Sequence, residues 1–164
     1  MTKDMPPRKF YLEDHVQGDT IECGTYTLTA EDIVAFATRW DPQPWHVDEE
    51  AANASLFGGL TACSAHIFAI YSIITPQWQN GAVQQAIASL GFDEMRMHKP
   101  VYAGDHLRCV TLIDSVRPSR SKPDRGIVVY ATELRNQHDE VVFSIKCTTL
   151  MARQPVDGGN TTDQ

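Results

Sequence analysis

Apolar residues are concentrated in one stretch of the chain, residues 58–74, which reads GGLTACSAHIFAIYSII. A wider window, residues 51–92, contains no Asp, Glu, Lys or Arg. Apolar side chains fall on nearly every side of a helix through this stretch, and a helix with that pattern is buried. At roughly 15 residues it is too short to cross a bilayer, which needs about 20, and Pro76 ends it. We therefore predict a core helix with the rest of the chain wrapped around it.

The remaining pattern predicts one strand and two helices before the core helix, and four strands after it. Residues 21–28 alternate and are rich in threonine, which is typical of a strand. Thr29 and Asp32 resemble a capping box at the start of an amphipathic helix that ends near Trp40. Asp48 begins a short helix that runs to Ala54. The later strands are residues 86–97, 107–116, 126–136 and 141–152, with turn-forming residues between them.

This order of elements predicts an α+β fold, in which antiparallel strands form a curved sheet that packs on the central helix. A length of 164 residues corresponds to one domain, which we place at residues 10–152. Residues 1–9 are polar and contain two prolines, so we expect a flexible arm there. Residues 153–164 have almost nothing to bury, and we expect a mobile tail.

Composition narrows the class of protein. The net charge of −7 argues against a nucleic-acid binder, which needs a basic face. No basic segment followed by an apolar one stands at the start, so we expect no signal peptide, no membrane partner and a cytoplasmic location. The four cysteines are widely spaced without a CxxC pair, which favours reduced thiols in or near the core over a zinc site. We predict no metal site.

The segment from Asp41 to Asp48 is the first candidate for chemistry. Its two prolines disfavour a helix or a central strand and stiffen the backbone. A rigid loop can hold the Asp41 carboxylate and the His46 imidazole together, and such a pair can activate water. The alternative is that Asp41 caps a turn and His46 is a hydrogen-bonded structural residue. A metal site at His46 and Asp48 is a weaker hypothesis than either of these, because no other cluster of ligand residues accompanies them.

Two further segments are candidates for lining a site. Gly58 and Gly59 precede the core helix, so its first backbone N–H groups could face a polarised carbonyl oxygen; close helix packing is the alternative. The stretch from Arg96 to Val101 leads into a tight turn at residues 103–105 that could border the same site.

Three stretches, DPQPWHVD, FGGLTACSAH and RMHKPVYAGD, resemble the MaoC-type acyl dehydratases, relatives of the (R)-specific enoyl-CoA hydratases. The resemblance extends over residues 26–151 and implies a hotdog fold, an antiparallel sheet wrapped around one long helix, in a homodimer or a larger dimer-based oligomer. It implies that Asp41 and His46 are the catalytic dyad and that the Ser64 N–H is the oxyanion donor. The family usually has Asn at Gln43 and commonly has glycine at Ser64. The other residues assigned to substrate binding are Gly59, Ser72 and Trp45.

The implied activity is a hydro-lyase reaction, in which water adds to a trans-2-enoyl thioester or leaves a 3-hydroxyacyl thioester. The substrate is an acyl-CoA, and no other cofactor is implied. The pocket walls are expected near Trp45, Phe57, Phe68 and Tyr71, and His66 is either at the site or a core residue. The cations that could meet CoA phosphates, or simply form a solvated hairpin, are Arg96, Lys99, Arg120, Lys122 and Arg125.

Two other functions remain open. A hotdog thioesterase would hydrolyse the same class of substrate, but such enzymes usually carry a carboxylate on the central helix, and this helix has none. A non-catalytic protein that binds acyl thioesters is the third hypothesis, because Gln43 and Ser64 depart from the family pattern.

Overall fold

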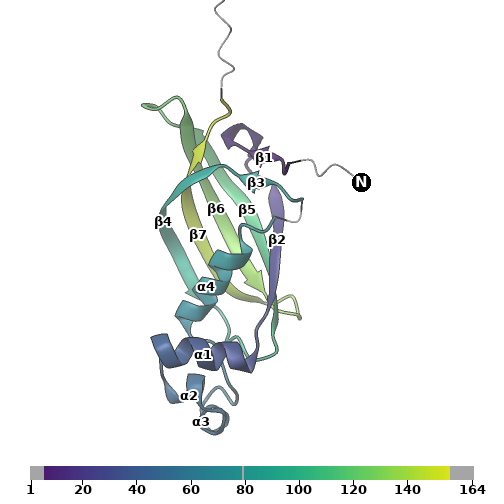
Figure 1. Cartoon of the computed structure of the whole chain (residues 1–164), viewed down its shortest axis with the longest axis vertical. Coiled ribbons are helices and arrows are strands. Elements are labelled where there is room, and N and C mark those ends of the chain that lie inside the picture. Colours follow the sequence, from purple (N-terminus) through teal and green to yellow (C-terminus); the bar gives the residue numbers. More distant parts are fainter. Residues whose placement is uncertain (1–5, 79, 156–164) are drawn as a thin grey trace, which may run out of the picture.

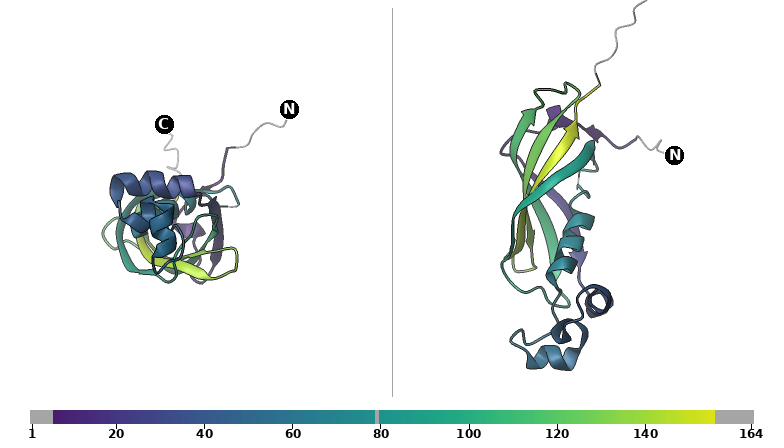
Figure 2. Two further views of the ribbon diagram at one scale, coloured as in Figure 1. Left: turned by 90° about the horizontal axis from the view of Figure 1, so that it is seen from below. Right: turned by 90° about the vertical axis from the view of Figure 1, so that its left-hand side faces the viewer.

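The computed structural model describes residues 6–78 and 80–155, and its main feature is a five-stranded antiparallel sheet that curves around one helix (Figures 1 and 2). The helix is α4, Ser64–Ile74. The strand order is β2-β5-β6-β7-β4. The strands are β2 (Thr20–Thr27), β4 (Ala86–Met97), β5 (His106–Pro118), β6 (Arg125–Arg135) and β7 (Val141–Ala152). The predicted α+β fold with a curved sheet around a central helix is confirmed.

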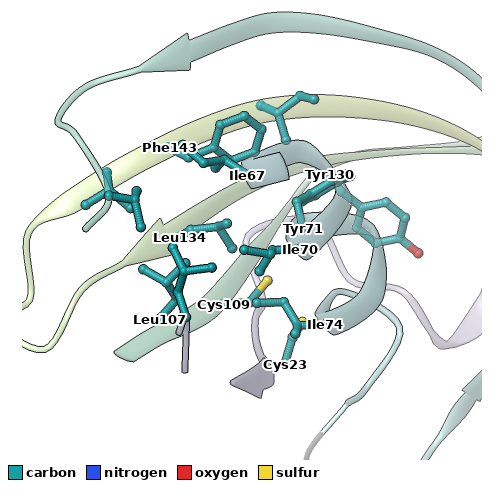
Figure 3. Close-up of a cluster of buried hydrophobic side chains, with 14 of the residues drawn as sticks. Cys23, Ile67, Ile70, Tyr71, Ile74, Leu107, Cys109, Tyr130, Leu134 and Phe143 are labelled. Atoms are coloured by element: carbon teal, nitrogen blue, oxygen red, sulfur yellow. The ribbon is translucent and has the colours of Figure 1, made fainter. Parts of the chain in front are cut away.

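The side chains that join the sheet to the helix alternate along the strands. In β6 every second residue is buried, and Tyr130 and Leu134 face the helix together with Cys147 and Phe143, their register partners on β7. Ile67, Ile70 and Ile74 lie along one face of α4 at helical spacing and pack onto this surface (Figure 3). Strand alternation and helical periodicity therefore meet in one hydrophobic core.

The central helix differs from the prediction in length and in burial. It begins at Ser64 because residues 60–63 are extended: Thr61 forms an isolated bridge with Tyr102, and the Ala62 N–H donates to the Val101 carbonyl. It is not buried on all sides, since Ile73 is 54% exposed. The apolar stretch is longer than the helix because it includes the extended residues 60–63. It predicted too much burial because one apolar side of α4, at Ile73, is exposed in the single chain.

Three short helices lie beyond the N-terminal end of α4 (Figure 1). Helix α1, Ala30–Trp40, begins at the predicted capping box, in which Thr29 accepts from the Asp32 N–H. Helix α3, Glu49–Ala54, begins at Asp48 as predicted. Helix α2, Pro44–Val47, contradicts the expectation that residues 41–48 contain no helix. Pro44 is its first residue, where a missing N–H costs no hydrogen bond and the fixed φ favours a helix.

The N-terminal segment covers the opposite end of the molecule. Strand β1, Lys9–Phe10, pairs in parallel with β3, Val83–Gln84, and the 3₁₀ turn η1, Leu12–Asp14, follows it. Leu12 is buried against Gly126, where a Cβ would lie only 2.4 Å from the Leu12 side chain. The arm predicted at residues 1–9 therefore overlaps a strand at Lys9. Residues 1–5 and 156–164, the rest of the predicted arm and most of the predicted tail, lie outside the described residues.

Within the described ranges, no helix combines the length and the apolar character that a membrane crossing requires.

Candidate active site

A cavity of about 350 Å³ lies at the N-terminal end of α4, where three parts of the chain meet. The α1–α2 connection contributes Asp41 and His46, and the chain into α4 contributes Thr61 and Ser64. The end of β4 and the turn after it close the third side. The remaining lining residues are Phe57, Ala62, Cys63, Ile67, Met97, His98, Lys99 and Pro100. The structure thus brings Asp41, His46 and Ser64 to one cavity.

His46 is held by the backbone of the extended segment before α4. Its Nδ1–H donates to the Thr61 carbonyl oxygen at 2.6 Å, and the residue is only 8% exposed. The isolated bridge between Thr61 and Tyr102 fixes the position of that carbonyl. The hydrogen bond to the Thr61 carbonyl therefore fixes the orientation of the imidazole, which the four-residue helix α2 alone could not do.

The two partners of His46 also fix which ring nitrogen carries the proton. A carbonyl oxygen only accepts hydrogen bonds, so the proton is on Nδ1. On the other side of the ring, the Trp45 indole N–H, which can only donate, lies 3.1 Å from Nε2. Nε2 is thus an unprotonated acceptor, which is the state that a general base requires.

Asp41 reaches the cavity from the C-terminal end of α1. Its N–H donates to the Ala37 carbonyl at 2.9 Å, and its own carbonyl accepts from the Gln43 N–H at 2.8 Å. Its side chain is half-buried and lines the same cavity as His46. Gln43 is the N-cap residue of α2; it is exposed and does not line the cavity.

Ser64 occupies the first position of α4, at the edge of the cavity. The N-cap residue is Cys63, and no side chain caps this helix end. The N–H groups of a first helical turn have no partner within the helix and carry its positive dipole end. Gly59 lies elsewhere: it packs against the Tyr102 ring and is not part of the cavity wall. The expectation of glycines directly at the helix start was wrong, because α4 begins five residues after Gly59.

Two other candidates on α4 lie away from this cavity. Ser72 is two turns further along the helix, where its hydroxyl donates to the Phe68 carbonyl at 3.0 Å. His66 stacks on Phe36 of α1, with ring centroids 4.4 Å apart. Its Nδ1 has no hydrogen-bond partner among the described residues, and burial lowers its pKa. His66 is therefore a core residue that packs by stacking rather than by the hydrogen bonds expected of a core histidine.

The candidate cations separate into two groups. Lys99 lines the cavity and forms an ion pair with Glu140, which lowers the pKa of that carboxyl group. Arg96 is exposed and its guanidinium donates to the Met95 carbonyl. The other three cations lie at the opposite end of the sheet (Figure 1): Arg120 and Lys122 are in the β5–β6 connection, and Arg125 is the first residue of β6.

Sequence reasoning missed Thr61 and His98. Thr61 acts through its backbone carbonyl, so no side-chain pattern marks it. His98, whose Nε2 lies 2.8 Å from Ser144 Oγ, stands in the stretch before the predicted tight turn. No group of three or more potential metal ligands occurs among residues 6–78 and 80–155.

Comparisons with known proteins agree with this geometry. The model of the MaoC-like domain family matches residues 15–134. The crystal structure of a MaoC-like dehydratase from Rhodospirillum rubrum has a TM-score of 0.82 at 36% identity, over 90% of this chain and 99% of that one. A double-hotdog protein of Mycobacterium tuberculosis has a TM-score of 0.73 at 17% identity, over 90% of this chain and 45% of that one, which supports the hotdog fold.

Two sequence relatives complete the comparison. The Bacillus subtilis protein YdeM is 28% identical over 87% of this chain and 99% of its own length. Mesaconyl-CoA hydratase from Haloarcula marismortui is 33% identical over 46% of this chain. The match covers only 22% of the length of that hydratase.

Proposed function

The chain belongs to the MaoC-like dehydratase family, and we propose that it adds water to trans-2-enoyl-CoA thioesters or removes it from the corresponding 3-hydroxyacyl-CoA. The observation that carries the proposal is the shared cavity: a carboxylate, an imidazole with an unprotonated Nε2 and an uncapped helix N-terminus all line it. The hydratase relative supports this class of reaction.

His46 and Asp41 act on the water molecule and on the α-carbon. Nε2 of His46 accepts a proton from the water as its oxygen bonds to the β-carbon. The dyad then returns one proton to the α-carbon, so the product contains one whole water molecule. General acid–base catalysis of this kind contributes roughly 10²- to 10⁴-fold in rate. Because Trp45 donates to the same Nε2, the water has to share or displace that hydrogen bond.

The N-terminus of α4 stabilises the enolate-like oxygen. When water adds to the β-carbon, negative charge develops on the thioester oxygen. Ser64, whose N–H belongs to the first turn of α4, lines the cavity, and the helix dipole favours an anion at this end. Preorganised donors of this kind stabilise the charge where it develops.

A thioesterase is the second candidate that the fold allows. Such hotdog enzymes usually carry the acting carboxylate on the central helix. Helix α4 reads SAHIFAIYSII and contains neither Asp nor Glu, and among the described lining residues of the cavity the only carboxylate is on the α1–α2 connection. The position of Asp41 favours hydration.

The acting form is a homodimer that buries the edge strand β4. Eleven of its twelve residues are exposed, and the apolar side chains among them include Ile87 (48%), Leu90 (54%) and Met95 (46%). Ile73 of α4 is also exposed. An apolar edge strand with open hydrogen-bonding groups is a template for pairing, and a second copy would cover it.

The decisive experiment compares wild type with Asp41→Asn, which keeps the size of the side chain and removes its charge. We expect wild type to hydrate crotonyl-CoA and the variant to lose about 100-fold or more in kcat at unchanged melting temperature. Loss of the enoyl absorbance without CoA release supports hydration. Release of free CoA by wild type would instead establish a thioesterase, and tight binding without turnover a binding protein.

A further inference from the structure

Trp45 holds the reactive nitrogen of the His46 imidazole in a hydrogen bond that no step of the proposed reaction uses. Its indole N–H donates to Nε2 over 3.1 Å. Nδ1 of the same ring is engaged by the Thr61 carbonyl oxygen, so both ring nitrogens have a partner within the protein. Trp45 itself is not among the described residues that line the cavity at the N-terminal end of α4. The nitrogen that serves as the base is therefore occupied by a side chain of the protein.

The indole and the reacting water cannot both use Nε2 throughout the reaction. A neutral imidazole has one acceptor nitrogen, and an indole N–H can only donate. Once Nε2 has taken a proton from water it is itself a donor, so an indole N–H directed at it would face a second N–H group. The imidazole also becomes positively charged at that moment, and the hydrogen of the indole N–H carries a positive partial charge. The indole of Trp45 must therefore leave Nε2 before the proton is transferred.

The surroundings of Trp45 leave room for this movement. Trp45 is the second residue of the four-residue helix α2 and is only half-buried. Its ring packs at a tilt against Phe57, with ring centroids 6.3 Å apart, and Phe57 is itself 38% exposed. Since both rings are partly open to solvent, the indole can rotate outward without entering the buried core.

We propose that the contact between Trp45 and His46 is inhibitory: the indole N–H occupies Nε2 in the resting protein, and water reacts only after the ring has turned away. The proposal rests on the proposed function, in which Nε2 of His46 accepts a proton from water. We call the two arrangements the closed and the open state. One ordinary hydrogen bond favours the closed state by about fivefold, and it lowers kcat/KM by about the same factor.

Protonation of His46 gives this inhibition a distinct pH dependence. A protonated Nε2 is a donor, so the closed state exists only while the imidazole is neutral. In acid, the reaction is limited by the small neutral fraction of His46, and the closed state no longer removes an appreciable part of the protein. The inhibition is therefore complete at alkaline pH and disappears as the pH falls through the range in which His46 titrates.

Other titratable groups near His46 do not produce the same pattern. Asp48, two residues further on, is exposed and accepts a hydrogen bond from the Ala51 N–H. The other titratable side chains among the described residues of the cavity wall are Asp41, Cys63, His98 and Lys99. All of these groups are unchanged in a Trp45 variant. Their own pH dependence therefore cancels when the rates of the variant and wild type are divided.

Trp45→Phe tests the proposal, because phenylalanine keeps an aromatic ring and has no N–H. With crotonyl-CoA, we expect kcat/KM of the variant to exceed that of wild type about fivefold at about pH 8.5. The ratio should approach one toward about pH 5, on the acid side of the usual histidine range. A change that only disturbed packing would alter the rate by the same factor at every pH. A variant that is no faster at about pH 8.5, or a ratio that does not depend on pH, would overturn the proposal.

Trp40→Phe is the matched control, because it makes the same substitution at an indole that does not contact His46. Trp40 is 62% exposed at the end of α1, and its ring packs on the Arg39 guanidinium group at 4.9 Å. This variant should have the kcat/KM of wild type at each pH. If it were accelerated as much as Trp45→Phe, the gain would not come from Nε2, and the inhibitory contact would be refuted.

Chemical labelling examines the same contact without a hydration assay. Diethyl pyrocarbonate acylates an unprotonated imidazole nitrogen, which in His46 is Nε2, since Nδ1 carries the proton. At about pH 7.5 we expect His46 to be labelled about fivefold more slowly in wild type than in Trp45→Phe, as measured by peptide mass spectrometry. The exposed His138 should react equally in both proteins and serves as the internal reference. Equal labelling rates at His46 would overturn the proposal.

The two experiments separate this inference from the proposed function. If wild type does not hydrate crotonyl-CoA, the hydratase proposal fails, and the labelling of His46 still decides whether Trp45 occupies Nε2. If crotonyl-CoA is hydrated but His46 is labelled equally fast in wild type and Trp45→Phe, the hydratase proposal stands and the inhibitory contact is refuted.

Discussion

Helix α4 is flanked by two cavities of similar volume, about 350 Å³ and about 340 Å³, which differ in the kind of side chain that each contains. The first, at the N-terminal end, has a carboxylate, two imidazoles and a lysine at its wall. The second, beside the C-terminal half, has hydroxyls, a thiol, an amide and aromatic rings, and none of its described lining residues is charged. The proposed reaction takes its acid–base groups from the first cavity only.

Helix polarity explains why the chemistry is at one end. An N-terminus offers free N–H groups and a positive dipole, which suits a developing anion. The last turn of α4 offers carbonyls, and there Thr75 and Ser72 direct their hydroxyls to the Tyr71 and Phe68 carbonyls. An oxyanion at the C-terminal end of α4 would face carbonyl oxygens, which would repel it.

The largest expected effect comes from removing the backbone donor at the first cavity. Ser64→Pro deletes the N–H at the first position of α4, where proline is well tolerated. Cys63 already has φ −72 and ψ 160, which suits a residue before proline. We expect kcat to fall about 100-fold or more with little change in melting temperature.

Ser64→Ala, which keeps the N–H, is the control and should retain most activity. If Ser64→Pro were folded and as active as Ser64→Ala, α4 would supply no oxyanion donor from this residue, and the contrast between the two helix ends would be lost.

A smaller effect is expected from the exposed strand beside the second cavity. Leu90→Asp places a charge on β4, and it should shift the protein from twice 18.3 kDa toward the monomer mass in sedimentation. Wild type that sediments as a monomer would contradict the dimer.

The smallest effect concerns stability and arises behind the second cavity. Burial lowers the pKa of His15 below 6.5. Below pH 6.5 the unfolded chain therefore binds a proton that the folded protein resists, so the free energy of unfolding should decrease as the pH falls from 7 toward 5. The variant His15→Gln should be less stable than wild type at pH 7, because it loses the hydrogen bond between His15 and Tyr130.

The variant should also show a shallower pH dependence, by at most one proton, or about 1.4 kcal/mol per pH unit. Urea titrations at several pH values measure both effects. His66 is buried with a lowered pKa as well, and its contribution should remain in the variant. An unchanged slope would show that His15 has the same pKa in the folded protein as in the unfolded chain.

Much of the fold could be predicted from the sequence because its signals are local. Period-two alternation located β6 and β7, and the Thr29 capping box located α1. The length of α4 could not be predicted, because residues 60–63 are as apolar as the helix but pair with residues 101–103. Such long-range pairing leaves no periodic signal in either segment.

The site divides in the same way. Asp41, His46 and Ser64 were found from motifs, and the structure places them at one cavity. Ser72 was assigned to that site through the family resemblance and Gly59 because it precedes the core helix, and neither of them lines the first cavity. Of the expected pocket walls, Tyr71 lines the second cavity instead of the first. The second cavity could not be located as a separate one, because its hydroxyl residues come from five separate elements and gather only when the sheet curves around α4.

The attachment of the imidazole to the peptide carbonyl at position 61 has an evolutionary consequence. Every one of the twenty amino acids has this backbone oxygen. A substitution at position 61 therefore keeps the acceptor of the His46 hydrogen bond, as long as the new side chain can be packed. This contact therefore depends on the route of the main chain between residues 60 and 63, which carries the oxygen. A comparison of relatives that scores only side chains would overlook the main-chain contact that orients this imidazole.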